Sequence, residues 1–82
     1  MTVYYTYVLK SEVSDFYYKG HCQNLAVRLV QHNSGMTKSI RPYLPFKLIY
    51  FEKFESLNEA IRREKYFKTS AGRRYLSSKL IF

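Results

Sequence analysis

An arginine and a histidine stand one helical turn apart in the segment after Asn24, and both residue types suit phosphate chemistry. Arg28 and His32 are separated by four positions, so their side chains can converge on one point of a helix surface. An arginine presents a planar fork of donors to phosphate oxygens, and a histidine can donate to an anion or relay a proton. Alternatively, the pair belongs to an ordinary solvated helix face.

A single glutamate interrupts the apolar stripe of a second expected helix. The stripe follows helical spacing, and Glu64 stands among its apolar members, which are Leu57, Ala60, Ile61 and Phe67. A carboxylate on a face that should be buried indicates one of two arrangements. Either the helix borders a cleft with a functional group in it, or Glu64 forms a surface salt bridge with its basic neighbours at positions 62, 63 and 65.

Two tyrosines in predicted strands complete the candidate chemistry. Tyr7 and Tyr18 lie in segments that can pair as a hairpin, where tyrosines often form cross-strand pairs instead of reactive groups. Other kinds of site lack their residues. One Cys and two His are too few for a tetrahedral zinc site, and there is no glycine-rich phosphate loop or dinucleotide fingerprint. Any chemistry therefore depends on Tyr, Arg, His and one Glu.

The elements that must position these residues follow from the hydrophobic pattern. Aromatic and β-branched residues predict strands over residues 2–10 and 16–22, joined by a polar turn. Asn24 is a suitable cap for a helix predicted over Leu25–Asn33, and Gly35 supplies the positive φ that ends it. Residues 34–45 contain two prolines and a glycine, which predicts a mobile loop facing the partner.

The second half of the chain predicts one more strand and two helices. Residues 46–54 carry apolar side chains on both faces, which favours a strand covered on both sides. Ser56 and Glu59 have capping-box spacing and predict a helix to about Lys68, and residues 69–82 predict a final short helix. The expected fold class is α+β, a small three-stranded antiparallel sheet flanked by helices in the order β-β-α-β-α-α.

Composition limits the size and the partners of the protein. The 82 residues suffice for a single domain, residues 1–82. The chain has 14 Lys and Arg against 6 Asp and Glu, a net charge of +8, which favours a polyanionic partner. The single Cys22 cannot form an internal disulfide, no apolar run reaches a membrane span, and the start lacks the basic segment of a signal peptide. We therefore expect a cytoplasmic protein without a membrane partner.

Four segments, in this order, resemble the motifs of the GIY-YIG nuclease family, most closely its small stand-alone members grouped with the excinuclease C endonuclease domain. The resemblance covers Tyr4 to about Leu80. "YTYVL" (5–9) and "YKG" (18–20) stand at the first and second motifs, and "NLAVRLVQHNSG" (24–35) and "EAIRREKYFK" (59–68) at the arginine and glutamate helices.

The chain departs from the family pattern at several positions. Tyr5 and Thr6 replace the Gly-Ile of the first motif, and Lys19 replaces the central Ile of the second. His21 occupies a position where some members carry a lysine. No clear counterpart follows Glu64 for the asparagine that some members use.

The resemblance implies an enzyme, a metal-dependent DNA endonuclease that hydrolyses phosphodiester bonds, structure-selective and related to repair. It implies one Mg²⁺ or Mn²⁺ ion held by Glu64. Arg28 would neutralise phosphate charge, and His32 would orient a group or relay a proton. Tyr7 or Tyr18, with a lowered pKa near the metal and the arginine, would take a proton from the attacking water.

A set of basic side chains is expected to hold DNA, or alternatively RNA, through its phosphates. These residues are Lys38, Arg41, Arg62, Arg63, Lys65, Lys68, Arg73, Arg74 and Lys79. Simple solubility is the alternative explanation for them. Tyr43 would stack on an unpaired base or pack on the sheet.

Two other functions fit the same residues. One is a non-catalytic nucleic-acid-binding module on a nuclease fold, which the motif departures favour. The other is a nuclease subunit docked on a protein partner that supplies targeting.

Overall fold

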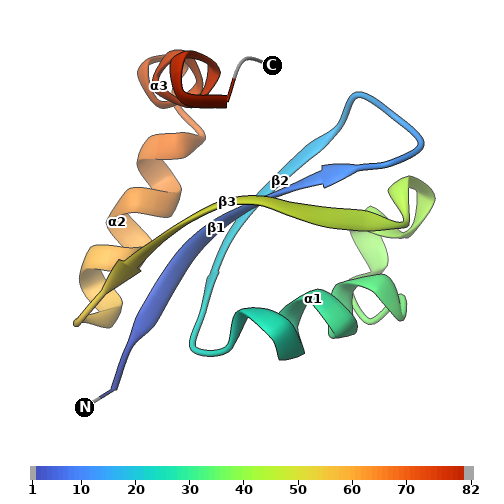
Figure 1. The fold of residues 1–82 in the computed structure, drawn as a ribbon, viewed down its shortest axis with the longest axis horizontal. Coiled ribbons are helices and arrows are strands. Elements are labelled where there is room, and N and C mark those ends of the chain that lie inside the picture. Colours follow the sequence, from blue (N-terminus) through green and yellow to red (C-terminus); the bar gives the residue numbers. More distant parts are fainter. Residues whose placement is uncertain (1, 81–82) are drawn as a thin grey trace.

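The structure is a computed structural model that describes residues 2–80 (Figure 1). Its elements are β1 (Tyr4–Ser11), β2 (Tyr17–Cys22), α1 (Leu25–Asn33), the 3₁₀ helix η1 (Lys38–Tyr43), β3 (Phe46–Phe54), α2 (Leu57–Phe67) and α3 (Ser70–Leu80). The α+β class and the order β-β-α-β-α-α are confirmed, with η1 as an addition. Among residues 2–80, no helix has the length and apolar character needed to cross a bilayer.

The sheet is antiparallel, and its central strand is β1. The strand order is β2-β1-β3, so that Tyr7 lies opposite Gly20 on one side and opposite Phe51 on the other. The prediction that residues 46–54 form a strand covered on both sides is wrong, because β3 is an edge strand and its Phe51 side chain is 49% exposed. The strand buried on both faces is β1.

Helices cover both faces of the sheet, and each face has its own core. In Figure 1, α1 lies on one side of the strands and α2 and α3 on the other. Neighbouring residues of β1 point to opposite faces, as strand geometry requires. Tyr7 and Leu9 pack with Ile40 on the α1 side, whereas Val8 packs with Phe67 on the α2–α3 side.

The two predicted helix starts are confirmed by hydrogen bonds. The Asn24 side chain accepts from the Val27 backbone N–H at 3.1 Å, and the Ser56 hydroxyl accepts from Glu59 N–H at 3.2 Å. Gly35 has φ of +86°, and its N–H donates to His32 O at 3.1 Å, so it ends α1 as predicted.

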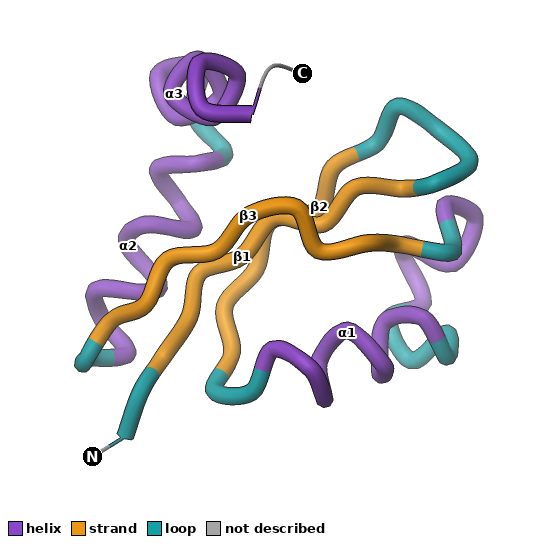
Figure 2. The backbone as a smooth tube through the Cα atoms, in the orientation of Figure 1, coloured by secondary structure: helices purple, strands orange, loops and turns teal. Residues whose placement is uncertain are grey.

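The segment predicted as a mobile loop is packed against the domain instead. It contains η1, and Ile40 of η1 is buried in the α1-side core. The Tyr43 ring stacks on Phe16 with 4.0 Å between ring centroids, and the Ser11 hydroxyl donates to Tyr43 O at 2.6 Å. Of the two alternatives for Tyr43, packing within the domain is the one observed. Figure 2 shows this segment as a short helical turn, flanked by loops, between α1 and β3.

Candidate active site

Four of the five predicted catalytic residues converge on the α1 face of the sheet. The Tyr7 hydroxyl lies 2.8 Å from His32 Nε2, and the rings of Tyr18 and His32 are 4.8 Å apart. The Tyr7 and Tyr18 rings are 6.2 Å apart, and interactions with Tyr7, and secondly with Tyr18, raise the pKa of Arg28. These side chains come from three elements, β1, β2 and α1, and lie close together.

Gly20 makes this arrangement possible because the Tyr7 ring crosses its backbone. A Cβ atom at Gly20 would lie 2.6 Å from the Tyr7 hydroxyl oxygen and 2.7 Å from its Cζ. Tyr7 is only 2% exposed and cannot easily move aside. Absence of a side chain at position 20 therefore lets the Tyr7 hydroxyl reach His32.

His32 is a buried and neutral histidine with a partner at each ring nitrogen. Its side chain is 0% exposed, and Nδ1 lies 2.7 Å from the Thr37 hydroxyl. Burial, and secondly the nearby Arg28 charge, lower the pKa of His32. A neutral ring has one donor and one acceptor. We assign Nε2 as the acceptor from the Tyr7 hydroxyl and Nδ1–H as the donor to Thr37.

The protonation of Tyr7 differs from the expectation of a lowered tyrosine pKa. Burial raises the pKa of Tyr7 far above its ordinary value, and the nearby Arg28 offsets only part of that rise. Tyr7 is therefore a protonated phenol at neutral pH, consistent with its donation to His32.

The buried His32 is expected to make the fold less stable at acid pH. Its folded pKa is lowered, whereas in the unfolded chain the ring titrates near the ordinary value of 6.5. Below that pH the unfolded chain binds a proton that the folded chain does not. The free energy of unfolding should therefore fall as the pH drops through about 6.5, and should go on falling until the folded ring is protonated, as measured by urea titration.

The controls separate His32 from the rest of the chain. The fall should persist in His21→Gln and become smaller in His32→Gln. NMR titration of the His32 ring in the natural protein provides a second test that needs no variant. A midpoint at or above 6.5 would contradict the assignment of a neutral buried ring.

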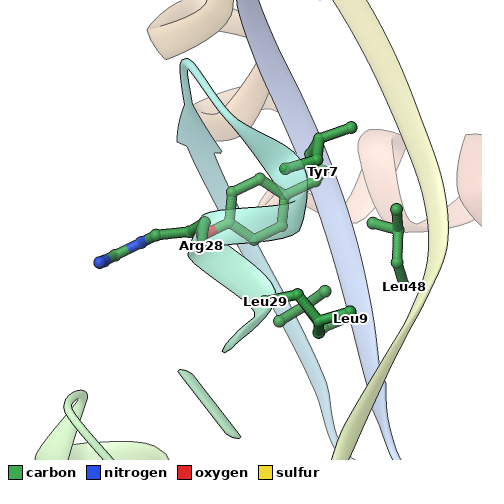
Figure 3. Close-up of a pocket in the computed structure, with 6 residues that line it drawn as sticks. Tyr7, Leu9, Arg28, Leu29 and Leu48 are labelled. Carbon is green, nitrogen blue, oxygen red and sulfur yellow. The ribbon is translucent and has the colours of Figure 1, made fainter. Parts of the chain in front are cut away.

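Arg28 leads from this cluster to the surface. Figure 3 shows its side chain beside the Tyr7 hydroxyl, with the guanidinium extending outward, away from the leucines. The Arg28 Nη1 donates to Gln31 Oε1 at 3.0 Å. The small pocket between Tyr7, Leu9 and Leu48 is too tight to admit a water molecule. A substrate would therefore contact the exposed rim, where Arg28 and the half-buried Tyr18 lie.

Glu64 lies on the other face of the edge strand β2. Its Oε1 is 2.6 Å from His21 Nδ1, and its Oε2 accepts from Lys68 Nζ at 2.8 Å. Within residues 2–80, neither Glu64 oxygen is hydrogen-bonded to the four residues on the α1 face. Because side chains alternate along β2, Tyr18 faces α1 and His21 faces α2. Glu64 and the four residues on the α1 face therefore lie on opposite faces of an edge strand.

Sequence reasoning missed the partners of Glu64. The predicted alternative was a salt bridge with the basic neighbours at 62, 63 or 65, but the partners are His21 and Lys68. The i, i+4 spacing to Lys68 was readable from the sequence. The pairing with His21 was not, since it joins residues that are 43 positions apart.

Glu64 is ionised and could hold a divalent ion through one carboxylate. Burial alone would raise the pKa of Glu64, but hydrogen bonds from Lys68 and His21 outweigh it and keep the pKa below its usual value. Each carboxylate oxygen accepts one hydrogen bond here and has a second lone pair. Magnesium is often held by one carboxylate together with waters and substrate phosphate. The single carboxylate of Glu64 fits this kind of site. Residues 2–80 contain no cluster of three His, Cys, Asp or Glu that would enclose an ion by themselves.

The predicted nucleic-acid-binding residues occupy two separate surfaces. Exposed side chains on α2, α3 and the junction between them form one group, which comprises Arg62, Lys65, Lys68, Arg73, Arg74 and Lys79. Lys38 and Arg41 form the other group on η1, which packs on the opposite side of the sheet. The two groups are therefore separate parts of the surface.

Arg63 has an internal role instead of an exposed one. Its Nε donates to Glu52 Oε1 at 2.8 Å, and its Nη2 donates to Glu52 Oε2 at 3.2 Å. The guanidinium also lies 4.7 Å from the Tyr75 ring centroid and 4.9 Å from that of Phe67. Arg63 thus ties α2 to β3 and to α3, and we leave it out of the proposed phosphate contacts.

Comparison with known proteins identifies similar chains. The UPF0213 protein of Clostridium perfringens is 43% identical over 65 residues, which cover 78% of this chain and 69% of that protein. The UPF0213 protein of Staphylococcus haemolyticus is 37% identical over 73 residues, covering 84% of each chain. The solution NMR structure of a UPF0213 protein from Bacillus halodurans has a TM-score of 0.55 and 29% identity, covering 93% of this chain and 83% of that one.

A family model described as the GIY-YIG catalytic domain matches residues 3–76. This match spans all four segments on which the sequence resemblance rested, and the UPF0213 relatives are small stand-alone proteins of the same kind. The chain therefore belongs to the GIY-YIG catalytic domain family.

Proposed function

We propose that residues 1–82 act as one nuclease domain that hydrolyses phosphodiester bonds in DNA with one divalent ion. Membership in the GIY-YIG catalytic domain family supports nuclease activity. The observation that carries the proposal is the convergence of Tyr7, Tyr18, Arg28 and His32 from three elements. A surface with a net charge of +8 favours a polyanionic substrate.

The proposed site lies along the exposed edge of β2. Because β2 is an edge strand, a substrate phosphate at this edge can contact Arg28 from one face and Glu64 from the other. Arg28 would neutralise the charge that develops on the phosphate in the transition state. Glu64 would hold Mg²⁺ or Mn²⁺, which when bound supplies further positive charge at the phosphate.

Of the two tyrosines, Tyr18 is the proposed proton acceptor. Tyr18 is half-buried and lies at the rim, whereas Tyr7 is fully buried and its pKa is raised. Tyr7 would instead position His32 through the hydrogen bond between them, and Thr37 holds the other side of that ring. The hydrogen bonds that join Tyr7, His32 and Thr37 would thus hold the side chains that pack behind Tyr18 in fixed positions.

The proposed substrate is branched or flapped DNA, in a cytoplasmic repair process. Phosphate contacts by exposed bases give affinity without reading sequence, which supports recognition by shape. The resemblance to the excinuclease C endonuclease domain supports the link to repair. A protein partner that supplies targeting is also part of this proposal.

The test is a cleavage assay with the full chain on single-stranded, duplex, flapped and branched DNA. Cleavage is expected with Mg²⁺ or Mn²⁺ and none with EDTA. Arg28→Ala should lower the rate by about 10²- to 10³-fold, in the range found for lost transition-state donors. Lys53→Gln removes one positive charge from the far edge strand and should leave the rate unchanged.

A second candidate is a non-catalytic nucleic-acid-binding module on the same fold. One observation favours it, since both Glu64 oxygens already accept hydrogen bonds from basic side chains. This candidate predicts salt-sensitive binding of DNA or RNA by the natural protein and by its Arg28→Ala and Lys53→Gln variants, without cleavage by any of the three. That result would overturn the nuclease proposal.

A further inference from the structure

We propose that Lys19, Lys68 and Arg73 form a binding site for a second backbone phosphate of the nucleic acid, next to Glu64. This inference rests on the proposed function insofar as the ligand is a polynucleotide. It gives a role to Lys19, the residue that departs from the second motif and that was not among the predicted nucleic-acid-binding residues.

Strand geometry places Lys19 on the α2–α3 side of the sheet. Lys19 pairs with Val8 across the β1–β2 ladder, and Val8 packs against Phe67 and Leu76 on that side. His21, two residues further along β2, points the same way and contacts Glu64 of α2. Lys19 is half-buried there, and its ammonium lies close enough to Arg73 and Lys68 for their charges to act on it.

The junction between α2 and α3 supplies the other two cations. Lys68 is the C-cap of α2, and its Nζ donates to Glu64 Oε2 at 2.8 Å. Arg73 lies in the first turn of α3, and its Nη2 donates to the Lys68 carbonyl oxygen at 3.1 Å. This backbone hydrogen bond holds the guanidinium beside Lys68 and leaves its other donors available.

The charges in this cluster do not balance. Lys19, Lys68 and Arg73 contribute three positive charges, whereas the carboxylate beside Lys68, that of Glu64, already accepts from Lys68 and His21. Within residues 2–80, the Lys19 side chain forms no hydrogen bond or ion pair. Burial lowers the pKa of Lys19, and repulsion from Arg73 and Lys68 lowers it further. A phosphate group would relieve this repulsion, and its oxygens suit both ammonium and guanidinium donors.

The position of the cluster indicates a phosphate other than the one that is cleaved. The proposed reacting phosphate lies between Arg28 and Glu64 at the edge of β2. Lys19 lies on the α2–α3 face, two residues before His21, and Arg73 contacts Lys68, whereas Tyr18 faces α1. A strand that crosses the edge of β2 would present a neighbouring phosphate there.

The experiment measures binding of a fluorescent single-stranded oligonucleotide by anisotropy, over a range of salt concentrations in EDTA. Lys19→Gln should weaken binding about 5- to 10-fold at low salt and reduce the slope of log K against log salt by about one, as for loss of a phosphate contact. Lys19→Arg keeps the charge and should keep the slope. Lys53→Gln carries the same net charge as Lys19→Gln and should keep it too.

The outcomes separate this site from the nuclease proposal. An unchanged slope in Lys19→Gln, or an equal reduction in Lys53→Gln, would overturn the phosphate site. Circular dichroism melts of all variants establish that they are folded. Because binding is measured without metal, a natural protein that cleaves nothing but shows the Lys19 effect would overturn the nuclease proposal and support the site.

Discussion

Glu64→Gln is expected to reduce metal-dependent DNA cleavage by about a thousand-fold, equivalent to about 4 kcal/mol of transition-state stabilisation. The reason is the loss of the single carboxylate that could hold the divalent ion at the edge of β2. A neutral carboxamide oxygen is a much weaker ligand for Mg²⁺ than a carboxylate in this position, where water and phosphate supply the other ligands.

The same substitution should preserve the fold and the binding of DNA. Glutamine has the shape of glutamate, and its amide oxygen can still accept a hydrogen bond from Lys68. Removal of a negative charge beside Lys68 also reduces repulsion of the phosphate backbone. Binding in EDTA should therefore equal or exceed that of the natural protein. Single-turnover cleavage and anisotropy measure the two effects, and Mn²⁺ binding followed by electron paramagnetic resonance measures loss of the ion.

Glu55→Gln is the matched control, since it makes the same charge change at an exposed position before α2. It should leave cleavage and Mn²⁺ binding unchanged. If Glu64→Gln cleaves DNA at the natural rate, Glu64 is not the metal ligand. The membership of the GIY-YIG family would be unaffected by that result, because it rests on residues 3–76 as a whole.

Gly72→Ala is expected to destabilise the fold by roughly 3–5 kcal/mol, a large effect for a single methyl group. A Cβ atom at Gly72 would lie 1.9 Å from the Tyr66 carbonyl oxygen and 2.7 Å from the Phe67 Cα. Both atoms are backbone atoms of α2, so no side-chain movement can relieve the clash. The helices α2 and α3 would have to separate.

Such separation would disturb the core on that face of the sheet. Phe67 and Leu76 are fully buried between the two helices and Val8. A domain of this length has a total stability of about 4–12 kcal/mol, so the substitution would remove roughly a quarter of that stability or more. Urea unfolding followed by circular dichroism measures the loss. Ser77→Ala, at an exposed position of α3, should change stability by less than about 0.5 kcal/mol. A Gly72→Ala protein as stable as this control would mean that the helices do not pack as closely as described.

The helix boundaries could be predicted from the sequence because the signals are local. Asn24 and Ser56 accept hydrogen bonds from N–H groups three residues ahead, and Gly35 takes a positive φ that other residues avoid. Each signal acts within one turn of the chain and needs no tertiary partner. The spacing of Arg28 and His32 on one helix was likewise readable from the sequence.

Burial of the strands and of η1 depended on the tertiary structure. Apolar residues on both faces of β3 suggested a strand covered on both sides, but pairing placed β1 in the centre and left Phe51 at the edge. Residues 34–45 are rich in turn residues, yet this segment is held against the domain because the Ile40 side chain is buried in the core on the α1 side. Composition alone does not show which of several apolar segments obtains the buried position.

The candidate site, too, was predicted from the sequence only in part. The types of its residues, and the family that they resemble, were evident in the order of four short segments. The sequence did not reveal that Tyr7 is buried against His32, that Glu64 pairs with His21, or that Arg63 is held by Glu52. These contacts join residues that are 25, 43 and 11 positions apart. Local hydrogen bonding and periodicity determine elements, whereas strand order and helix packing decide which side chains meet and which remain available to a substrate.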